Sequence, residues 1–424
     1  MPPSEHTISV DQLQIGIYIH LDIGWMHHPF SFNSFKIRDA RQIQTLRQLG
    51  LTSIRWDPAR SDTRPLAQAP IPETTPSPAL TAGEGNAEIP AMAEKLRRIR
   101  RLAEHKAGMA RVEQAFHSTA SVVRSINRNI HSQPEKTIAE ANRLIDDIAD
   151  TLLAAPELAI QVMSERPGSE DIYLHSLNVS ILAMTLAREL KLPVELVRIV
   201  GIGALFHDIG LIEIPSRILN NPGPLTRPER EFREQHCQYG VDIGRKAGLP
   251  PAVLKIIHQH HECVDGTGYP QHLQGEAIDP LARLVGLINA YDNLCNPANP
   301  AHAMTPHEAL SQMFAQQRSR HDPRFLQAFI RFMGVYPPGT VVLLSNDVIG
   351  LVISVNSARP LRPTVVIYDS GIPKAEAIIL DLEDEPEINI SKAIRPAQLP
   401  AAIYDYLSPR KRVSYYFDAT ANPS

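Results

Sequence analysis

The spacing of hydrophobic residues changes several times along this chain of 424 residues. Alternation in the segment TISVDQLQIGIYIHLD, residues 7–22, predicts a β-hairpin or meander. Residues 35–50 have helical spacing at Ile43, Leu46 and Leu49, with Gly50 as a stop, and LTSIRW predicts another strand. Residues 1–57 are therefore expected to form a small α/β domain.

The next segment has little hydrophobic content. Residues 58–90 are rich in Pro, Ala, Thr and Gly, which predicts a linker. Residues 91–133 predict one long connecting helix that contains the basic stretch EKLRRIRRLAEHK. A solvated helix face is favoured over a nucleic-acid surface, because no aromatic platform accompanies these charges. This helix could also carry a homodimer seam.

Helical spacing dominates residues 134–333, after Pro134 ends the preceding helix. Thr226 and Glu229 match a capping box at a helix start. Residues 334–424 contain the strand-like segments GTVVLLSNDVIGLVISVN and PTVVIYD, which predict a small β-rich domain. The expected fold is mainly α, with a helical bundle flanked by a small α/β N-terminal domain and a small β-rich C-terminal domain. The predicted helical segments are PEKTIAEANRLIDDIADTLLA, SEDIYLHSLNVSILAMTLARELKL, LVRIVGIGALFHDIG, TRPEREFREQHCQYGVDIGRKAG, PAVLKIIHQHHE and PLARLVGLINAYDNL.

Composition narrows the class of protein. A hydrophobic content of 43% supports a sizeable core, and a net charge of −4 implies no global attraction to nucleic acid or anionic lipid. Cys237, Cys263 and Cys295 form neither a disulfide framework nor a zinc pattern, which suits a reducing cytoplasm. The stretch RIVGIGALFHDIGLIEIP carries a central His-Asp pair, which favours a buried helix over a membrane span. The N-terminal segment MPPSEHTISV lacks a basic stretch followed by an apolar run, so no secretory signal is expected. A cytoplasmic protein is expected.

Histidines carry the candidate chemistry. The chain has 17 of them, and an isolated one on an apolar helix is more often a hydrogen-bonded core residue than a ligand. A set of imidazoles with one carboxylate, spread over the helices of one predicted bundle, instead favours a dinuclear metal cage. The members of this set are His175, His207, Asp208, His236, His260 and His261.

The residue types fit such chemistry. Neighbours on a helix differ by about 100° in direction, so the pairs 207/208 and 260/261 can each address two metals about 3.5–4 Å apart. Asp208 can bridge the ions with its two oxygens, and the ions would acidify a water for attack on phosphorus. Burying Asp208 in an apolar helix would be costly without a cation. His207 and Asp208 are thus the predicted catalytic pair. The alternative is a buried His-Asp hydrogen bond that serves structure only.

Three segments together resemble the HD-GYP family, a branch of the HD phosphohydrolases. They are HDIG at 207–210, IPSRILNNPGPLTRPE at 214–229 and HHECVDGTGYP at 260–270, and the resemblance covers about residues 165–333. It implies hydrolysis of cyclic di-GMP to pGpG or GMP. The N-terminal segments resemble the uncharacterised domain found ahead of some members, and FMGVYPPGTVVLLSNDVIGLVISVN resembles the segment that commonly follows the catalytic core.

The resemblance also implies roles for single residues. The six residues above fall on family metal-ligand positions, for two divalent ions such as iron or manganese. Asp171 falls where some members supply a carboxylate for a third metal, although it could equally be an exposed residue near a helix start. Apart from the resemblance, Arg283 could help the ions to stabilise the phosphorane charge if the protein is an enzyme. The GYP loop, linked in the family to contacts with GGDEF-domain cyclases, would shape the substrate side of the site through Gly266, Gly268, Tyr269 and Pro270. The alternative for this loop is an ordinary surface turn.

Three departures from the family pattern keep two hypotheses open. Leu211 stands where members usually carry a lysine, and Asn289 stands at the last metal-binding aspartate. The family's Arg-Pro-Tyr segment is missing from CNPANPAHAMTPHEAL. The first hypothesis is a metal-dependent cyclic di-GMP phosphodiesterase, weakened by these losses. The second is a catalytically degenerate member that acts as a nucleotide sensor or as an adaptor for GGDEF-domain partners.

Overall fold

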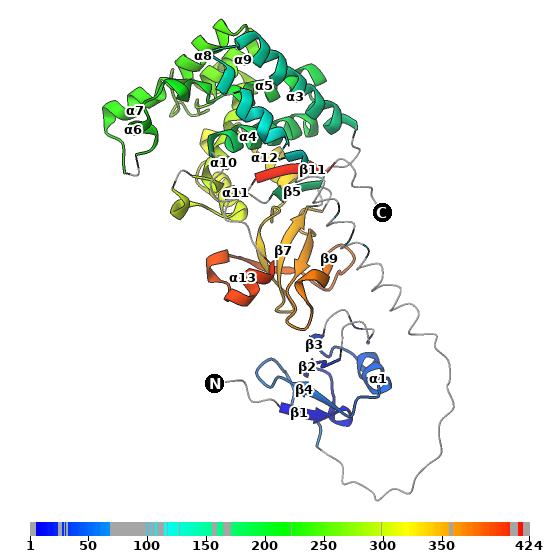
Figure 1. Cartoon of the computed structure of the whole chain (residues 1–424). Coiled ribbons are helices and arrows are strands. Elements are labelled where there is room, and N and C mark those ends of the chain that lie inside the picture. Colours follow the sequence, from blue (N-terminus) through cyan, green and yellow to red (C-terminus); the bar gives the residue numbers. More distant parts are fainter. Residues whose placement is uncertain are drawn as a thin grey trace, which may run out of the picture.

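The structure is a computed structural model, in which a β-rich C-terminal unit lies beside a helical bundle and a small N-terminal unit lies beyond it (Figure 1). The mainly α fold expected from the sequence is confirmed. The described residues are 6–23, 28, 30, 33–67, 100, 103, 107, 114–116, 118–126, 128–154, 159–163, 171–221, 223–297, 299–355, 359–407 and 414–418.

The N-terminal unit is a four-stranded antiparallel sheet with one helix. Its strands are β1 (His6–Ser9), β2 (Tyr18–His20), β3 (Ser34–Lys36) and β4 (Ser53–Trp56), in the order β1-β4-β2-β3. The predicted hairpin over residues 7–22 is wrong, because β4 lies between β1 and β2. The chain leaves β1 through a capping box in which Gln12 accepts the Ser9 amide hydrogen, and this starts the 3-10 helix η1 (Val10–Gln12). The predicted helix is present as α1 (Ala40–Gln48).

Residues 57–67, where the predicted linker begins, hydrogen-bond back onto this unit. The amide of Asp62 donates to the Gly16 carbonyl, and that of Leu66 to the Gln12 carbonyl. The rest of the predicted linker lies outside the described residues. Those described between 100 and 129 are helical, and a turn at 130–133 separates them from the next helix, as Pro134 predicts. The homodimer seam and the domain boundaries stay predictions.

The helical bundle holds the largest core, and α4 packs most extensively against α5. Within α5, every residue from Val200 to Phe206 is buried, as its apolar sequence requires. The helices are α3 (Pro134–Ala154), α4 (Asp171–Glu189), α5 (Val194–Phe206), η3 (Ile209–Glu213), α6 (Ser216–Leu219), α7 (Arg227–Glu234), α8 (His236–Lys246), α9 (Pro251–Gln259), η4 (Gly275–Ala277), α10 (Pro280–Cys295), η5 (Pro300–His302), α11 (Pro306–Ala315), η6 (Arg318–Arg320) and α12 (Pro323–Met333).

Three helices end earlier than their hydrophobic spacing predicts. The segment expected as one helix over residues 226–248 is divided at Gln235 into α7 and α8. Helix α5 stops at Phe206, directly before the His-Asp pair, and α9 stops at Gln259, directly before the two adjacent histidines. The pairs therefore stand at helix ends and not at neighbouring positions inside a helix. The capping box of Thr226 and Glu229 is confirmed, since the Glu229 carboxylate accepts from the Thr226 amide.

The C-terminal unit is a five-stranded antiparallel sheet in the order β10-β6-β7-β8-β9. Strands β6, β7 and β8 match the two strand-like segments of the sequence. The elements are β6 (Val341–Leu344), β7 (Ile349–Ser354), β8 (Thr364–Ile367), η7 (Lys374–Glu376), β9 (Ile379–Asp381), β10 (Ile390–Ile394), η8 (Pro396–Gln398) and α13 (Ala401–Leu407).

A further two-stranded sheet joins distant parts of the chain. Strand β11 (Ser414–Asp418) pairs antiparallel with β5 (Ala159–Met163), which precedes α4, and β11 lies against α4 (Figure 1). Neither strand was predicted. The N-terminal unit contacts the C-terminal sheet, since the Asn33 amide donates to Asp369 at 3.3 Å. Among the described helices, none combines the length and apolar character needed to cross a bilayer.

Candidate metal centre

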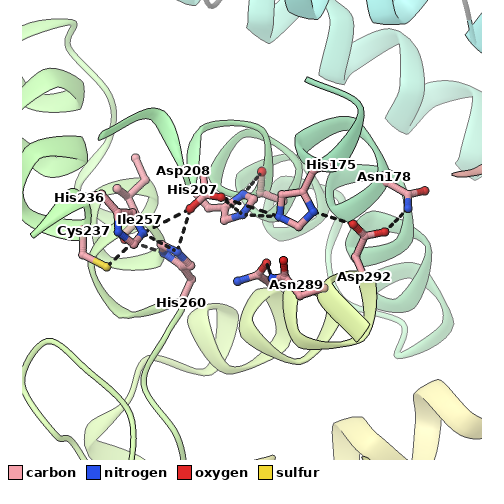
Figure 2. Close-up of polar contacts among 12 residues, drawn as sticks. His175, Asn178, His207, Asp208, His236, Cys237, Ile257, His260, Asn289 and Asp292 are labelled. Atoms are coloured by element: carbon pink, nitrogen blue, oxygen red, sulfur yellow. Dashed lines mark hydrogen bonds and ion pairs between the residues drawn. The ribbon is translucent and has the colours of Figure 1, made fainter. Parts of the chain in front are cut away.

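Asp208 lies at the middle of a cluster of histidines (Figure 2). Its Oδ2 is 3.8 Å from His175 Nε2 and 3.4 Å from His207 Nε2. Its Oδ1 is 3.3 Å from His236 Nε2 and 3.5 Å from His260 Nε2. Each carboxylate oxygen therefore faces a separate pair of imidazoles. All six residues singled out in the sequence meet here, because His261 joins the second group.

The side chain of Asp208 is 15% exposed and lies just beyond the end of α5. The expectation that it lies inside an apolar helix is therefore wrong, although the carboxylate is largely buried and this burial opposes its negative charge. The imidazoles around it offset that cost.

Backbone carbonyls fix the tautomers of three of these imidazoles. The Nδ1–H groups of His207, His236 and His260 donate to the carbonyls three residues earlier, at 2.7, 2.7 and 2.8 Å. A carbonyl only accepts, so Nδ1 must carry a hydrogen, and Nε2 carries a lone pair in the neutral ring and a second hydrogen in the protonated ring. These carbonyls belong to the last turns of α5, α7 and α9, where no intrahelical N–H is available to them. Each histidine thus satisfies a helix end and directs its Nε2 toward Asp208.

The Nε2 atoms of two histidine pairs face each other. His175 Nε2 is 3.2 Å from His207 Nε2, and His236 Nε2 is 3.5 Å from His260 Nε2. Two lone pairs at this separation repel unless a proton or a metal ion lies between them. Donors held about 2.1 Å from a common ion lie about 3.0–3.4 Å from one another, close to these distances. The donor set of imidazoles and one carboxylate suits a divalent transition metal. The residues present therefore fit the two-ion site that the fold family implies.

The pKa values within the cluster differ widely between its members. Burial raises the pKa of Asp208, but the charge of His207 and hydrogen bonds from neighbouring histidines bring that pKa well below its usual value. Burial lowers the pKa of His236, but its hydrogen bond to Asp208 outweighs this and raises the pKa to about 10. Burial lowers the pKa of His260 to about 4. The centre therefore combines an anionic carboxylate, a neutral imidazole and one imidazole that holds a proton strongly.

Asp292 orients His175 from outside this cluster. Its Oδ2 accepts a hydrogen bond from His175 Nδ1 at 2.6 Å, and its Oδ1 accepts from Asn178 and, at 2.9 Å, from Asn296 (Figure 2). Burial lowers the pKa of His175, but the hydrogen bond and charge of Asp292 raise it overall. A carboxylate behind a ligand histidine fixes the ring and strengthens the ligand. Sequence reasoning missed this role, although the spacing of Asn289 and Asp292 by one helical turn was visible.

The positions that depart from the family pattern lie beside the same centre. Asn289 is buried on α10, and its Oδ1 accepts a hydrogen bond from Asn293 Nδ2 at 2.7 Å. Leu211 lies in η3, one turn after Asp208. Asp171 is the first residue of α4, one turn before His175, but its side chain lies outside the described set. Its predicted role at a third metal stays a prediction.

The GYP loop folds tightly against the second histidine group. The Tyr269 ring stacks on His261 with centroids 4.5 Å apart, and its amide donates to the His261 carbonyl. A Cβ on Gly268 would lie 2.4 Å from that carbonyl oxygen, so only glycine fits. Glu262 accepts the amide hydrogens of Gln271 and Leu273 at 2.6 and 2.9 Å and so closes the loop behind the site.

The other predicted substrate-side residues lie around this loop. Gly266 forms a turn by donating its amide hydrogen to the Cys263 carbonyl, and Pro270 follows Tyr269. Arg283 lies on α10, and its guanidinium pairs with Asp322 at 2.9 Å. Substrate contacts of these residues stay predictions.

Comparison with known proteins shows the family of this chain. It is 30% identical over 378 residues to the cyclic di-GMP phosphodiesterase PA4108 of Pseudomonas aeruginosa, covering 87% of this chain and 86% of that protein. The chain belongs to the HD-GYP family. This HD-GYP protein matches an HD domain at residues 130–325, a domain of unknown function (DUF3391) at 5–141, and a KOW domain associated with HD domains at 341–402. The resemblance stated from the sequence motifs is confirmed.

Two further matches concern parts of this HD-GYP chain or its fold. It is 32% identical over 209 residues to the cyclic di-GMP phosphodiesterase response regulator RpfG of Xanthomonas campestris, covering 49% of this chain and 54% of that protein. Among solved structures, an HDG"Y"P protein from Bdellovibrio bacteriovorus aligns with a TM-score of 0.41 and 17% identity, over 77% of this chain and 98% of the other.

Proposed function

We propose that this protein is a metal-dependent phosphodiesterase that hydrolyses cyclic di-GMP to pGpG or GMP. The observation that carries the proposal is the pair of facing Nε2 contacts, at 3.2 and 3.5 Å, on either side of Asp208. A relative covering most of the chain is named a cyclic di-GMP phosphodiesterase, which supports the substrate.

The two halves of the cluster have separate roles in this proposal. His175 and His207, with Oδ2 of Asp208, would hold one divalent cation. His236, His260 and His261, with Oδ1, would hold the other. Iron or manganese is proposed, because imidazole and carboxylate ligands suit both. The bound ions would supply acidified water near neutral pH and neutralise charge on the scissile phosphate.

The chain's own residues then position these groups. Asp292 holds His175 in the tautomer that presents Nε2, and the helix-end carbonyls hold His207, His236 and His260 in the same way. The Tyr269 ring covers one face of His261 and excludes water from that side.

The test counts metal ions and follows substrate together. The protein is purified aerobically and anaerobically, and its metal content per chain is measured beside turnover of cyclic di-GMP. Two bound ions and turnover that is lost in Asp208→Ala would support the proposal. One ion or none, without turnover in either preparation, would contradict it.

The uncharged, hydrogen-bonded side chain of Asn289 favours a second candidate function. Its amide oxygen already accepts from Asn293 and carries no charge, so it is a weaker ligand than a carboxylate. Under this candidate the protein keeps the fold and one metal, and acts as a cyclic di-GMP sensor or as an adaptor that docks GGDEF-domain partners through the loop at 265–270.

Restoring the family residues separates the candidates. If the protein is degenerate, the double change Asn289→Asp and Leu211→Lys should switch on turnover in a chain that otherwise only binds cyclic di-GMP. If the wild-type chain is already an enzyme, the same change should alter turnover only modestly, and the metal count should already be two.

A further inference from the structure

Helix α10 carries three polar residues, Asn289, Asp292 and Asn293, at a spacing that places them on one face of the helix. Asp292 lies behind His175, whose Nδ1–H it accepts at 2.6 Å. Asn289 faces the centre from the same helix in Figure 2. This face of α10 therefore lies against the histidine cluster.

The side chain of Asn293 donates a hydrogen bond to the side chain of Asn289. Nδ2 of Asn293 and Oδ1 of Asn289 are 2.7 Å apart, and the two residues lie one helical turn from each other. Asn289 is only 2% exposed, whereas Asn293 is an exposed residue. Both line a cavity of about 100 Å³ that His260 and His261 also line. The hydrogen bond therefore joins a buried side chain at the centre to one that solvent can reach.

This hydrogen bond fixes the orientation of the Asn289 amide. An amide group has an oxygen that can bind a cation and an NH₂ group that repels one. The NH₂ group of Asn293 donates to the oxygen, and a rotation of the Asn289 amide by 180° would place two NH₂ groups against each other. An amide oxygen has two lone pairs, so one remains available after Asn293 has used the other.

The environment of His175 agrees with this orientation. Burial lowers the pKa of His175, Asp292 raises it, and a hydrogen bond with Asn289 adds a smaller increase. An amide raises the pKa of an imidazole through its oxygen, because an NH₂ group would disfavour the added proton. The oxygen of Asn289 is therefore directed toward His175.

We propose that Asn293 is a positioning residue that holds the Asn289 oxygen toward the ion shared by His175 and His207. This inference rests on the proposed function for its metal ion. A carboxylate at position 289 would present an oxygen to the ion in either orientation and would need no such partner. An amide presents an oxygen in only one of the two. Asn293 thus offsets part of the loss that results from Asn289 at a position where the family carries a metal-binding aspartate.

The test is a double-mutant cycle on the binding of Mn²⁺ to the full metal-free chain, followed by the electron paramagnetic resonance signal of free Mn²⁺. Asn293→Ala should weaken the binding of one ion about 3–10-fold, the usual effect of losing one hydrogen bond. In the Asn289→Asp background the same change should alter affinity less than about twofold, because either oxygen of a carboxylate can bind the ion. A merely structural role of Asn293 would lower affinity equally in both backgrounds.

Two further variants sharpen the result. Asn293→Gln keeps an NH₂ donor and should recover part of the affinity that Asn293→Ala loses. Asn142→Ala makes the same change at an exposed residue of α3, outside the cavity, and should keep the wild-type affinity. A thermal melt of each variant shows whether it is folded. Unchanged Mn²⁺ affinity in Asn293→Ala, or an equal loss in both backgrounds, would overturn the positioning role.

Failure of the positioning role and failure of the proposed function give different results, because the cycle needs no substrate. Turnover of cyclic di-GMP without coupling between positions 289 and 293 would remove the positioning role and leave the phosphodiesterase. Coupling between these positions without turnover would support the positioning role and remove the phosphodiesterase. A wild-type chain that binds no Mn²⁺ would overturn both.

Discussion

His175 shows how one buried carboxylate decides which nitrogen of an imidazole faces the metal centre. Asp292 accepts its Nδ1–H at 2.6 Å and is itself only 1% exposed, with two asparagines holding its other oxygen. Asp292→Asn should remove the charge behind the ring and lower metal affinity about 10–100-fold, the usual effect of losing such a partner. The measurement is metal content after dialysis against a weak chelator.

The matched control for this prediction is Asp147→Asn. Asp147 is an exposed residue of α3 far along the chain from the centre, and the same change there should leave metal content unaltered. Equal ion content in Asp292→Asn and in the control would show that Asp292 only stabilises the fold.

His236 makes metal loading sensitive to pH. Its pKa of about 10 means that, without metal, the ring is protonated at pH 7, and a metal ion must displace that proton. Metal binding at pH 7 should therefore release at least one proton per chain, and affinity should rise with pH by about tenfold per unit for each proton displaced. Calorimetry in buffers of different ionisation enthalpy measures the released protons. Binding that releases none between pH 6 and 8 would contradict this account.

At this scale the sequence identified the cluster but not its physical basis. The six cluster residues could be named because their family motifs are local in the chain. The role of Asp292 could not, because its partner His175 lies 117 positions away on another helix. The expected position of Asp208 inside an apolar helix was wrong because α5 ends at Phe206, directly before the pair, which hydrophobic spacing does not reveal.

Helix ends organise the centre at the scale of secondary structure. Helices α5, α7 and α9 each end within two residues of a histidine that caps a free carbonyl. The C-terminal end of a helix carries a partial negative charge of about half an electron, so three such ends favour a cation between them. The hydrophobic pattern predicted these helices but placed their ends too late in the chain, because apolar residues continue on both sides of each break.

Gly210 sets the position of Asp208 through the contact between η3 and α8. A Cβ there would lie 2.0 Å from the His236 carbonyl oxygen and 2.5 Å from the Gly240 nitrogen, both backbone atoms that cannot move aside. Gly210→Ala should therefore lower the free energy of unfolding by about 1–3 kcal/mol, as overpacking does, and reduce metal content. Denaturant unfolding measures the first effect.

The matched control is Gly223→Ala. Gly223 lies in the loop before α7, where an added Cβ would approach only the Asn221 side chain, at 3.4 Å. Its unfolding free energy should stay within about 0.5 kcal/mol of the wild-type value. A stable, metal-loaded Gly210→Ala chain would mean that η3 can move away from α8 without cost to the site.

At the scale of the whole molecule, the helices that carry the histidine cluster are linked to residues near the end of the chain. Strand β11 pairs with β5 over five residue positions, from Ser414 opposite Met163 to Asp418 opposite Ala159. Strand β5 is followed in the chain by α4, which carries His175, and β11 itself lies against α4. The sequence could not reveal this pairing, because the two strands are more than 250 residues apart and each is too short to stand out.

A chain that ends at Leu407 lacks β11, and its structure should therefore be less stable at β5 and at the start of α4. Without β11, the amides of β5 lose their partner strand, and they should exchange hydrogen at least about tenfold faster, as expected when local structure opens. The start of α4 should exchange faster as well, and metal held by His175 should be lost more readily. A chain that ends at Asp418 keeps β11 and is the matched control. If the amides of residues 159–163 exchange at the same rate in both chains, pairing with β11 does not protect them. The bundle alone would then hold β5 in place.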